Sequence, residues 1–436
     1  MAEQPIRVSV QIAGEDVPAG RLWTHRHGRR ESATFAYLAD YLRRPDSYEL
    51  DPALHDHEGQ QQTAVDQALF GAFSDCAPDG WGRGLVRRAE QRRAQLEGRA
   101  PRSLAEIDFL LGVRDDLRQG ALRFQDARGD AHLSPADEGV PQLVDLPRLL
   151  HAAEELERDE PSAEDLRLLL HGASSLGGAR PKAHVLDARG VLAIAKFPSP
   201  VRDTWDVIRW EAVALALAER AGIAVPPFEL LSIAGRPVLV VHRFDRHAGR
   251  RVGYVSAMTM LGARDGEQGS YLEIAEAIEA HSPRPADDLR ELWRRIVLTV
   301  LISNTDDHLR NHGFLRTSSA GWSLSPAFDL NPNPEGETKQ LATAIDERST
   351  LASIATALDV AGLFGLSERE ARGVLGEVLD ATGPWREVAG ANGLAGDEIE
   401  RLAPAFDHAE RALAQELALS IGLEGERRVA PVDREG

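Results

Sequence analysis

The sequence predicts an α+β fold in which a small β-rich lobe precedes a helical lobe, with a further domain of short strands and helices in front. Two hairpin-like pairs of apolar runs lie between residues 183 and 244. From about residue 251 onward, apolar residues recur at the three- and four-residue spacing that is typical of helices. Strand patterns open the chain and give way to helical ones. We therefore expect three domains, over residues 1–145, 146–250 and 251–436.

Each domain is expected to contain its own set of elements. The first has strands over 6–12 and 21–24, helices over 65–73, 81–95 and 104–111, and a linker over 125–141. The second has helices over 146–156 and 205–221, and strands over 183–186, 191–197, 228–233 and 237–244. The third has helices over 271–280, 289–303, 368–382 and 398–421, with a disordered tail over 424–436.

Composition limits the class of protein. The 436 residues include 50 Lys plus Arg and 69 Asp plus Glu, a formal net charge of −19. A field of this sign repels nucleic acid, although arginines cluster locally within 26–30 and 87–93. The single cysteine, Cys76, excludes an internal disulfide framework. No apolar run is long enough to span a bilayer and no targeting segment is recognised, so we expect a cytoplasmic protein without membrane association.

The segment 304–311 reads Asn-Thr-Asp-Asp-His-Leu-Arg-Asn, and Asp329 follows Asn311 by 18 residues. Phosphoryl transfer to a hydroxyl needs a carboxylate that orients the acceptor and oxygen ligands that hold Mg²⁺ against the phosphates. Asp306 could orient the acceptor, while Asn311 and Asp329 could bind the metal. The five-residue step from Asp306 to Asn311 equals the Asp-to-Asn step of the protein-kinase catalytic loop.

The alternative for this segment is an ordinary helix exit and turn, because Asp, Asn and His often cap backbone groups in loops. The helix expected in front of it favours the functional interpretation. Its apolar residues form one stripe, which would hold the loop on a buried, rigid base. These residues are Leu289, Leu292, Trp293, Ile296, Val297, Val300 and Leu301.

Lysine is rare in this chain. It occurs only at positions 182, 196 and 339, which leaves 47 of the 50 basic residues as arginine. Where arginine serves as the general cation, a retained lysine suggests a site that needs a compact ammonium group. Two of the three lysines lie 14 residues apart, in the domain expected to be β-rich.

The segment 171–182 is rich in small residues, among them Ser175, Gly177 and Gly178. Small residues let backbone amides approach phosphate oxygens closely, so the segment is a candidate phosphate loop. It matches neither the Walker loop nor the Gly-x-Gly-x-x-Gly form. An ordinary glycine-rich loop is the alternative.

Lys196 is expected to share a strand face with Leu192 and Ile194, and an inward-pointing ammonium group needs an anionic partner. ATP phosphates or Glu211 of the next helix could supply it, as in the Lys–Glu pair of kinases. A structural ion pair or a solvent-facing lysine is the alternative. His242 and Phe244, where the last strand leaves the lobe, would line an adenine pocket, unless His242 only ends that strand.

At these motifs the chain resembles the HipA-like serine/threonine kinases, the toxin half of a bacterial toxin–antitoxin pair, over essentially its whole length. The motifs are Ser-Leu-Gly-Gly-Ala-Arg-Pro-Lys at 175–182, His-Arg-Phe-Asp-Arg at 242–246, and the segments 304–311 and 326–331. The resemblance implies a two-lobed protein-kinase-like fold with an appended N-terminal domain. It also implies that ATP and Mg²⁺ are the cofactors.

The resemblance implies roles for single residues. Asp306 would be the catalytic base or acceptor-orienting group, Asn311 and Asp329 the magnesium ligands, and Lys196 the lysine that binds the ATP phosphates. Ser175 would be autophosphorylated, which in this family expels the phosphate loop; the preceding Ser174 leaves the modified serine open. His308 also fits the Asp-x-His-x-x-Asn pattern of lipid kinases, which leaves a small-molecule acceptor open.

The partners follow from the resemblance alone. They would be a small helix-turn-helix antitoxin (HipB-like), operator DNA reached mainly through that antitoxin, and a protein substrate. The substrate would be an aminoacyl-tRNA synthetase, of the glutamyl type, whose modification inhibits translation. The alternatives are a kinase of a small metabolite or antibiotic and a catalytically inactive corepressor. The intact set of Asp306, Asn311, Asp329 and Lys196 speaks against the corepressor.

Overall fold

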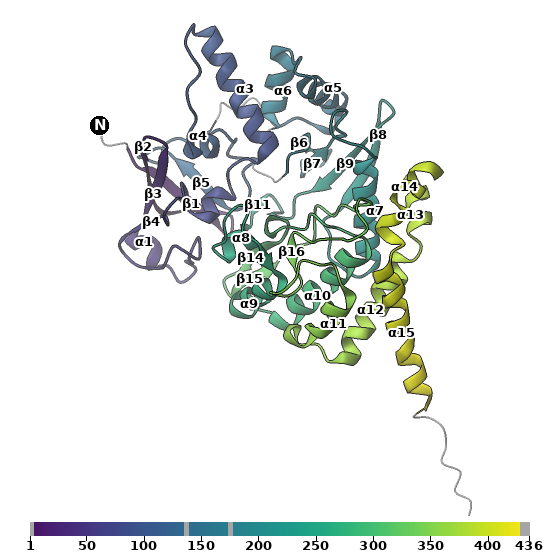
Figure 1. Cartoon of the computed structure of the whole chain (residues 1–436). Coiled ribbons are helices and arrows are strands. Elements are labelled where there is room, and N and C mark those ends of the chain that lie inside the picture. Colours follow the sequence, from purple (N-terminus) through teal and green to yellow (C-terminus); the bar gives the residue numbers. More distant parts are fainter. Residues whose placement is uncertain (1–3, 135–138, 173–177, 428–436) are drawn as a thin grey trace, which may run out of the picture. The chain divides into compact units, whose positions relative to one another are not determined.

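The computed structural model describes residues 4–134, 139–172 and 178–427 (Figure 1). The chain divides into two compact units. The first comprises Met1–Ile208, Pro226–Asp265 and Arg310–Ser325, and the second comprises Arg209–Val225, Gly266–Leu309 and Pro326–Gly436. The predicted α+β class is confirmed. The three-domain division stays a prediction, because contacts within one chain do not establish which segments fold independently.

The first unit begins with a five-stranded sheet in the order β4-β3-β2-β1-β5. Residues Val8, Val10, Leu22, Phe35 and Phe124 have no exposed surface and form its buried side. The strands are β1 (Ile6–Ile12), β2 (Glu15–His27), β3 (Arg30–Tyr37), β4 (Gln60–Gln62) and β5 (Leu122–Gln125). The accompanying helices are α1 (Ala39–Leu42), α2 (Gly71–Ser74), α3 (Gly80–Leu96) and α4 (Glu106–Leu111).

A second sheet of the first unit has the order β6-β7-β9-β8, and all its neighbouring strands are antiparallel. The strands are β6 (Lys182–Leu186), β7 (Leu192–Lys196), β8 (Phe228–Ile233) and β9 (Arg236–His242). Helices α5 (Leu146–Glu157) and α6 (Ala163–His171) lie beside it (Figure 1). Apolar residues of α3, α5 and α6 form one hydrophobic core with Ala193, Ala195 and Val240 of this sheet.

The first unit closes with short elements around a three-stranded sheet in the order β12-β14-β15. These strands are β12 (Gly253–Ser256), β14 (Gly313–Ser318) and β15 (Gly321–Leu324). A hairpin of β10 (Arg246–His247) and β11 (Arg250–Arg251), the helix α8 (Ala257–Met260) and the 3₁₀ turn η2 (Leu309–Asn311) complete this part. Ala257 donates its amide proton to the carbonyl of His312, next to Asn311.

The second unit is mostly helical and surrounds α10 (Pro285–Leu301), whose residues from Ile296 to Leu301 are all buried. The other helices are α7 (Val207–Arg220), α9 (Tyr271–His281), α11 (Ile354–Asp359), α12 (Glu368–Thr382), α13 (Trp385–Ala391), α14 (Gly396–Phe406) and α15 (Ala409–Arg427). A parallel two-stranded ladder joins β13 (Gly269–Ser270) to β16 (Thr343–Ala344). Trp293 of α10 donates to the carbonyl of Ala357 at 2.9 Å.

Three expectations about elements are wrong. Only the end of the helix expected over 65–73 is helical, because Asp66 has a φ of 64°, in the left-handed region, and Val65 is 80 % exposed. The helix expected over 398–421 is two helices, because the backbone leaves the helical region at Asp407. The tail is helical as far as Arg427, and residues 428–436 lie outside the described part.

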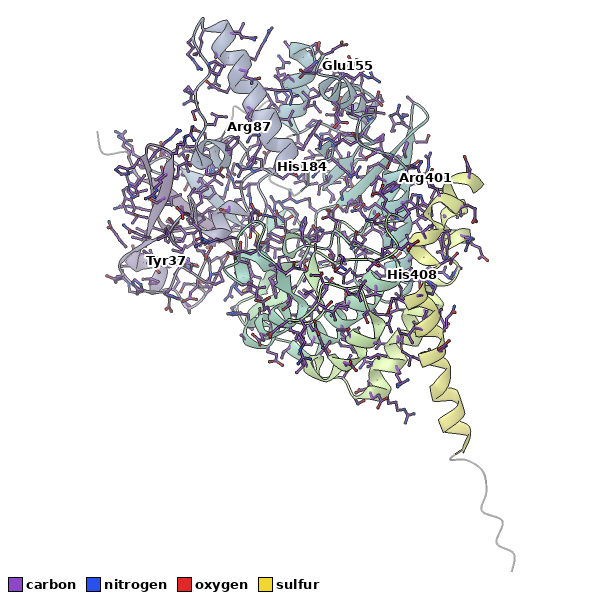
Figure 2. All side chains as sticks on the ribbon, viewed as in Figure 1. Tyr37, Arg87, Glu155, His184, Arg401 and His408 are labelled. Atoms are coloured by element: carbon purple, nitrogen blue, oxygen red, sulfur yellow. The ribbon has the colours of Figure 1, made fainter. Side chains whose placement is uncertain are left out.

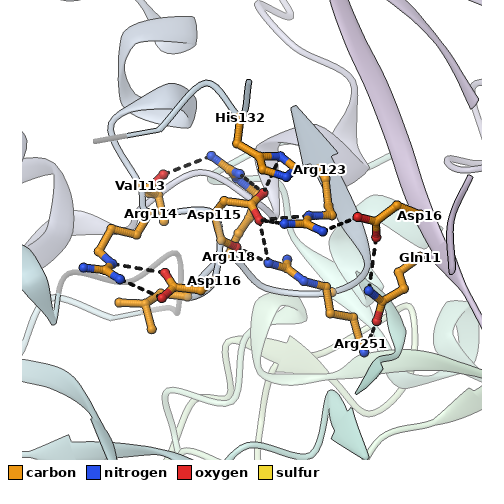
Figure 3. A network of polar contacts seen from close by, with 12 residues as sticks. Gln11, Asp16, Val113, Arg114, Asp115, Asp116, Arg118, Arg123, His132 and Arg251 are labelled. Carbon is orange, nitrogen blue, oxygen red and sulfur yellow. Dashed lines mark hydrogen bonds and ion pairs between the residues drawn. The ribbon is translucent and has the colours of Figure 1, made fainter. Parts of the chain in front are cut away.

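Buried charges connect the five-stranded sheet to the strands after β9 (Figure 3). Asp115 accepts hydrogen bonds from Arg118 at 3.2 Å, Arg123 at 2.9 Å and Arg251 at 3.0 Å. Arg118 has no exposed surface, and Arg123 also pairs with Asp16. One carboxylate thus compensates several guanidinium groups that burial would otherwise penalise.

A second buried carboxylate, Asp245, gives the His-Arg-Phe-Asp-Arg motif a structural role. It accepts from the amide of Gly120 at 2.7 Å, from Arg243 at 2.6 Å and from Arg246 at 2.8 Å. Burial would raise the pKa of Asp245, but the two guanidinium groups outweigh it and hold the pKa well below its usual range. Arg243 also contacts His184 of β6, which Figure 2 labels, at 2.6 Å. The motif therefore attaches the end of β9 to the segment before β5.

We expect Asp245→Asn to destabilise the first unit by about 3–5 kcal/mol, because the buried guanidinium group of Arg243 and the partly buried one of Arg246 lose their counter-charge. Urea unfolding followed by tryptophan fluorescence measures the change. Asp130→Asn is the matched control, since Asp130 is exposed, and should change stability by less than about 0.5 kcal/mol. Equal stability of the two variants would contradict the structural role of the motif.

Candidate active site

The predicted site residues are distributed over both units. The first unit carries Lys196, His242, Phe244, Asn311 and Gly178, and the second carries Glu211, Asp306, His308 and Asp329. Ser175 and Gly177 lie outside the described residues. The roles assigned to all these residues from the sequence stay predictions, and the structure gives the surroundings of those it describes.

Lys196 lies on the sheet face opposite the hydrophobic core. Ala193 and Ala195 of β7 point into that core and are fully buried, whereas Ile194 and Lys196 are partly exposed. The expectation that Lys196 shares a face with Ile194 therefore agrees with the strand, but this face is the more open one.

Lys182 is the direct cross-strand neighbour of Lys196, so two of the three lysines lie on one face. Like charges at such positions repel each other. Lys182 is buried and donates to the carboxylate of Asp79 at 2.8 Å and to the carbonyl of Gly178 at 3.2 Å. Asp79 thus neutralises one lysine of the pair. Nothing in the sequence pattern links Asp79 to Lys182, which lies 103 residues away.

These contacts also fix the end of the candidate phosphate loop. Gly178 has a φ of +106°, which only glycine adopts readily, and an added Cβ would lie 2.8 Å from the Lys182 ammonium nitrogen. Asp79 caps α3 by accepting from the amide of Gly82 at 3.0 Å, and Trp81 donates to the carbonyl of Lys182 at 3.0 Å. The N-terminus of α3 therefore anchors the loop where β6 begins.

His242 and Phe244 follow an alternating pattern at the end of β9. His242 and Phe244 are partly exposed, whereas the alternate residues Arg243 and Asp245 are buried. Arg243 and Asp245 form the buried ion pair described above. The amide of His242 donates to the carbonyl of Pro227 at 2.8 Å, so the backbone continues the strand to this residue. The partly exposed side chains remain candidates for contact with adenine.

In the second unit, the segment after α10 forms a tight loop. Ser303 has a φ of +52° and is fully buried, and the amide of Asn304 donates to the carbonyl of Thr299 at 2.9 Å. Asp306 is exposed, while the adjacent Asp307 is buried. Of these two consecutive carboxylates, Asp306 is the one accessible to a substrate.

Asp329 has a φ of +60°, a left-handed backbone conformation that is uncommon outside glycine and concentrates at functional sites. The side-chain oxygen of Asn304 accepts from the amide of Asn331 at 3.1 Å, and Asn331 donates to the carbonyl of Asp329 at 3.1 Å. The structure thus joins the segment of Asp329 to the loop of Asp306. Asn304 and Asn331 contribute to this connection.

The remaining lysine, Lys339, has a structural role that the sequence did not reveal. It is buried and donates to the carbonyls of Asn333 at 2.9 Å and Glu335 at 2.6 Å. Desolvation by burial lowers the pKa of its ammonium group. Lys339 therefore closes the turn that follows Asp329 and Asn331.

Several polar atoms of the loop are buried without a hydrogen-bond partner among the described residues. They are Ser303 Oγ, Asn304 Nδ2 and His308 Nδ1. Unsatisfied buried polar atoms are rare, so their occurrence in this loop is a feature that packing alone does not explain. Glu211 is buried within α7, and its pairing with Lys196 stays a prediction.

The chain is similar to proteins that are already known. Residues 174–385 match the family model described as the HipA-like C-terminal domain. The motifs 242–246, 304–311 and 326–331 all fall inside the matched range. The match also includes the whole of β6–β9 and α7–α12.

A protein of Haemophilus influenzae named "Putative kinase" is 29 % identical over 143 residues, which cover 29 % of this chain and 42 % of that protein. A protein of Sinorhizobium fredii named "Putative kinase Y4mE" is 28 % identical over 209 residues, covering 41 % of this chain and 48 % of that protein. The chain thus spans less than half the length of these curated relatives.

A solved structure extends the similarity to the whole fold. The complex of HipA, HipB and operator DNA from Shewanella oneidensis MR-1 matches with a TM-score of 0.64 and 16 % identity. The match covers 98 % of this chain and 100 % of that one, so the five-stranded sheet of the first unit is also part of the shared fold. This confirms the predicted HipA-like, protein-kinase-like fold.

No helix of the described residues is long and apolar enough to cross a membrane.

Proposed function

We propose that this protein transfers the γ-phosphate of ATP, in the presence of Mg²⁺, to a serine or threonine hydroxyl of a protein substrate. The observation that carries the proposal is the loop after α10, where the exposed Asp306 is followed by the buried Asp307 and bonded through Asn304 to the segment of Asp329. The match of residues 174–385 to the HipA-like C-terminal domain supports the same assignment.

The residues present fit a magnesium nucleotide. Asn311 and Asp329 offer an amide and a carboxylate oxygen, the ligand types that Mg²⁺ prefers. No group of three or more His, Cys, Asp and Glu residues that could enclose a metal occurs in the described part of the chain. Two protein ligands suit an ion that is also bound by phosphates and water. Bound Mg²⁺ would neutralise the charge that develops on the phosphates.

The chain's own residues would perform the remaining steps. Asp306 would accept a hydrogen bond from the substrate hydroxyl, direct its oxygen toward the phosphate and take up its proton. Lys196, on the open face of β7, would bind the phosphates with its ammonium group. His242 and Phe244 would contact the adenine, and Glu211 would position Lys196. His308, next to Asp307, would support the acceptor side of the loop.

The biological setting that we propose is a toxin–antitoxin pair. The HipA of Shewanella oneidensis was solved with HipB and operator DNA, which supports a helix-turn-helix antitoxin as the partner of this chain and DNA contact mainly through it. We propose that the protein acts in the cytoplasm, that its substrate is an aminoacyl-tRNA synthetase of the glutamyl type, and that inhibition of translation is the result. Autophosphorylation of Ser175 would switch the enzyme off, because added phosphate repels the ATP phosphates.

Asp306→Asn keeps the shape of the side chain and removes its charge, so transfer should fall by about 10²- to 10⁴-fold while ATP still binds. Transfer of ³²P from ATP and calorimetric titration with ATP measure the two effects. Asp380→Asn is the matched control, because Asp380 is exposed on α12. Near-normal transfer by the Asp306 variant would reject its catalytic role.

Asn311→Ala and Asp329→Ala each remove one oxygen ligand, so each should weaken binding of Mg-ATP more than binding of ATP in EDTA. Asp329→Ala should have the larger effect because it also removes a charge. Calorimetry with the non-hydrolysable analogue AMP-PNP, with and without Mg²⁺, measures both affinities without requiring activity. If both variants bind Mg-AMP-PNP as the wild type does, these residues are not metal ligands.

A further inference from the structure

Asp306 lies between Thr305 and Asp307. Each of these two neighbours accepts hydrogen bonds at its side chain and at its backbone carbonyl. The preceding Thr305 accepts at its hydroxyl from Asn333 Nδ2 at 2.8 Å, and at its carbonyl from the amide of Ala342 at 3.0 Å. The amide of Asn333 also donates to the carbonyl of Ser303 at 3.1 Å. One side of the loop is therefore attached to the segment that follows Asp329.

The other side is attached through Asp307. Its carboxylate accepts from the hydroxyl of Tyr271 and from the hydroxyl of Thr299 at 3.3 Å. Its carbonyl accepts from the hydroxyl of Thr343 at 2.6 Å. These donors belong to three different elements, since Tyr271 is the first residue of α9, Thr299 lies in α10 and Thr343 lies in β16.

The contact between Tyr271 and Asp307 is inside the second unit. Tyr271 has no exposed surface, and Asp307 is 3 % exposed. The pKa of Tyr271 is raised well above its ordinary value, mainly because the side chain is buried and also because the Asp307 carboxylate is close. The hydroxyl of Tyr271 therefore stays protonated and continues to donate. A buried carboxylate is costly unless donors surround it, so packing alone would favour an apolar residue at this position.

We propose that Tyr271 and Asp307 are positioning residues of the transfer reaction, which hold the loop so that the Asp306 carboxylate faces the acceptor hydroxyl. The inference rests on the proposed function, and it assigns roles to two residues outside the predicted site. Tyr271 lies 35 residues before Asp306 and acts on it through Asp307. A reacting group displaced by about 1 Å loses on the order of 10²-fold in rate, so loss of this anchor affects catalysis.

The test compares Tyr271→Phe with Tyr37→Phe in the full-length protein. Each substitution removes one hydroxyl from a buried tyrosine. Tyr37, which Figure 2 labels, belongs to β3 of the first unit, donates to the carbonyl of Leu54 at 3.0 Å and accepts from the amide of Leu50 at 2.9 Å. The assay measures kcat and KM for Mg-ATP with dephosphorylated casein as the acceptor, alongside Tm.

Tyr271→Phe should lower kcat by about 10- to 100-fold and leave KM for ATP within about twofold, because the nucleotide ligands are unchanged. Tyr37→Phe should lower Tm comparably and leave kcat unchanged. Asp307→Asn retains an acceptor oxygen for Tyr271 and should retain more activity than Asp307→Leu, which has none. An unchanged kcat in Tyr271→Phe, or an equal loss in Tyr37→Phe, would overturn the positioning role.

Hydrogen exchange separates this inference from the proposed function. In Tyr271→Phe, amides within residues 303–309 should exchange about tenfold faster than in the wild type, because the loop loses one of its anchors. Unchanged exchange there would overturn the inference even in an active enzyme. If the wild type transfers no phosphate from Mg-ATP to casein or to itself, the proposed kinase activity fails, and the exchange result alone decides whether Tyr271 holds the loop.

Discussion

The carboxylate of Asp245 is buried, and the first unit depends on how its charge is compensated. Arg243, Arg246 and the amide of Gly120 all donate to it. Through these bonds the end of β9 is fixed to the segment that leads into β5. The same segment supplies Asp115 to the arginine network of the five-stranded sheet (Figure 3). The sheet that carries Lys196 and the preceding N-terminal strands are thus joined by charges that must remain paired.

The second unit also contains a buried carboxylate that needs hydrogen-bond donors, and this carboxylate lies next to the candidate catalytic residue Asp306. Asp307 is buried, and the hydroxyl groups of Tyr271 and Thr299 donate to its carboxylate. Since its neighbour Asp306 is exposed, one pair of consecutive aspartates provides both the attachment of the loop and a carboxylate accessible to substrate. The Asn304–Asn331 hydrogen bond then joins this loop to Asp329.

Elements with a strong local pattern were predicted from the sequence. The strands 6–12 and 228–233 and the helix 368–382 have the predicted bounds, because alternation or helical spacing, capped by turn residues, defines them locally. Strands β3 and β5 were missed, because their identity depends on pairing with β2 and β1. The prediction of a helix over 65–73 was wrong. The apolar spacing suggested a helix, but it could not reveal that Asp66 adopts a left-handed backbone conformation.

Local patterns and long-range contacts also differ in what they predicted about the site. The spacing of Asp306, Asn311 and Asp329 was sufficient to propose their roles, since that spacing is itself the motif. The residues that hold the site in place could not be predicted from spacing. Asp79 and Tyr271 lie far from the motifs in sequence, and only the fold brings them to Lys182 and Asp307. Lys339 lies six residues after Asn333, but no local pattern reveals that it donates to the Asn333 carbonyl.

We propose that this chain binds Mg-ATP through Lys196, Asn311 and Asp329, with Asp306 at the γ-phosphate. A crystal structure with AMP-PNP and Mn²⁺, which replaces Mg²⁺ and gives an anomalous signal, tests it most directly. We expect one Mn²⁺ bound by oxygens of Asn311 and Asp329, the Lys196 ammonium group at the phosphates, and Asp306 facing the γ-phosphate. Nucleotide bound away from β7, or Mn²⁺ bound by other residues, would contradict the account.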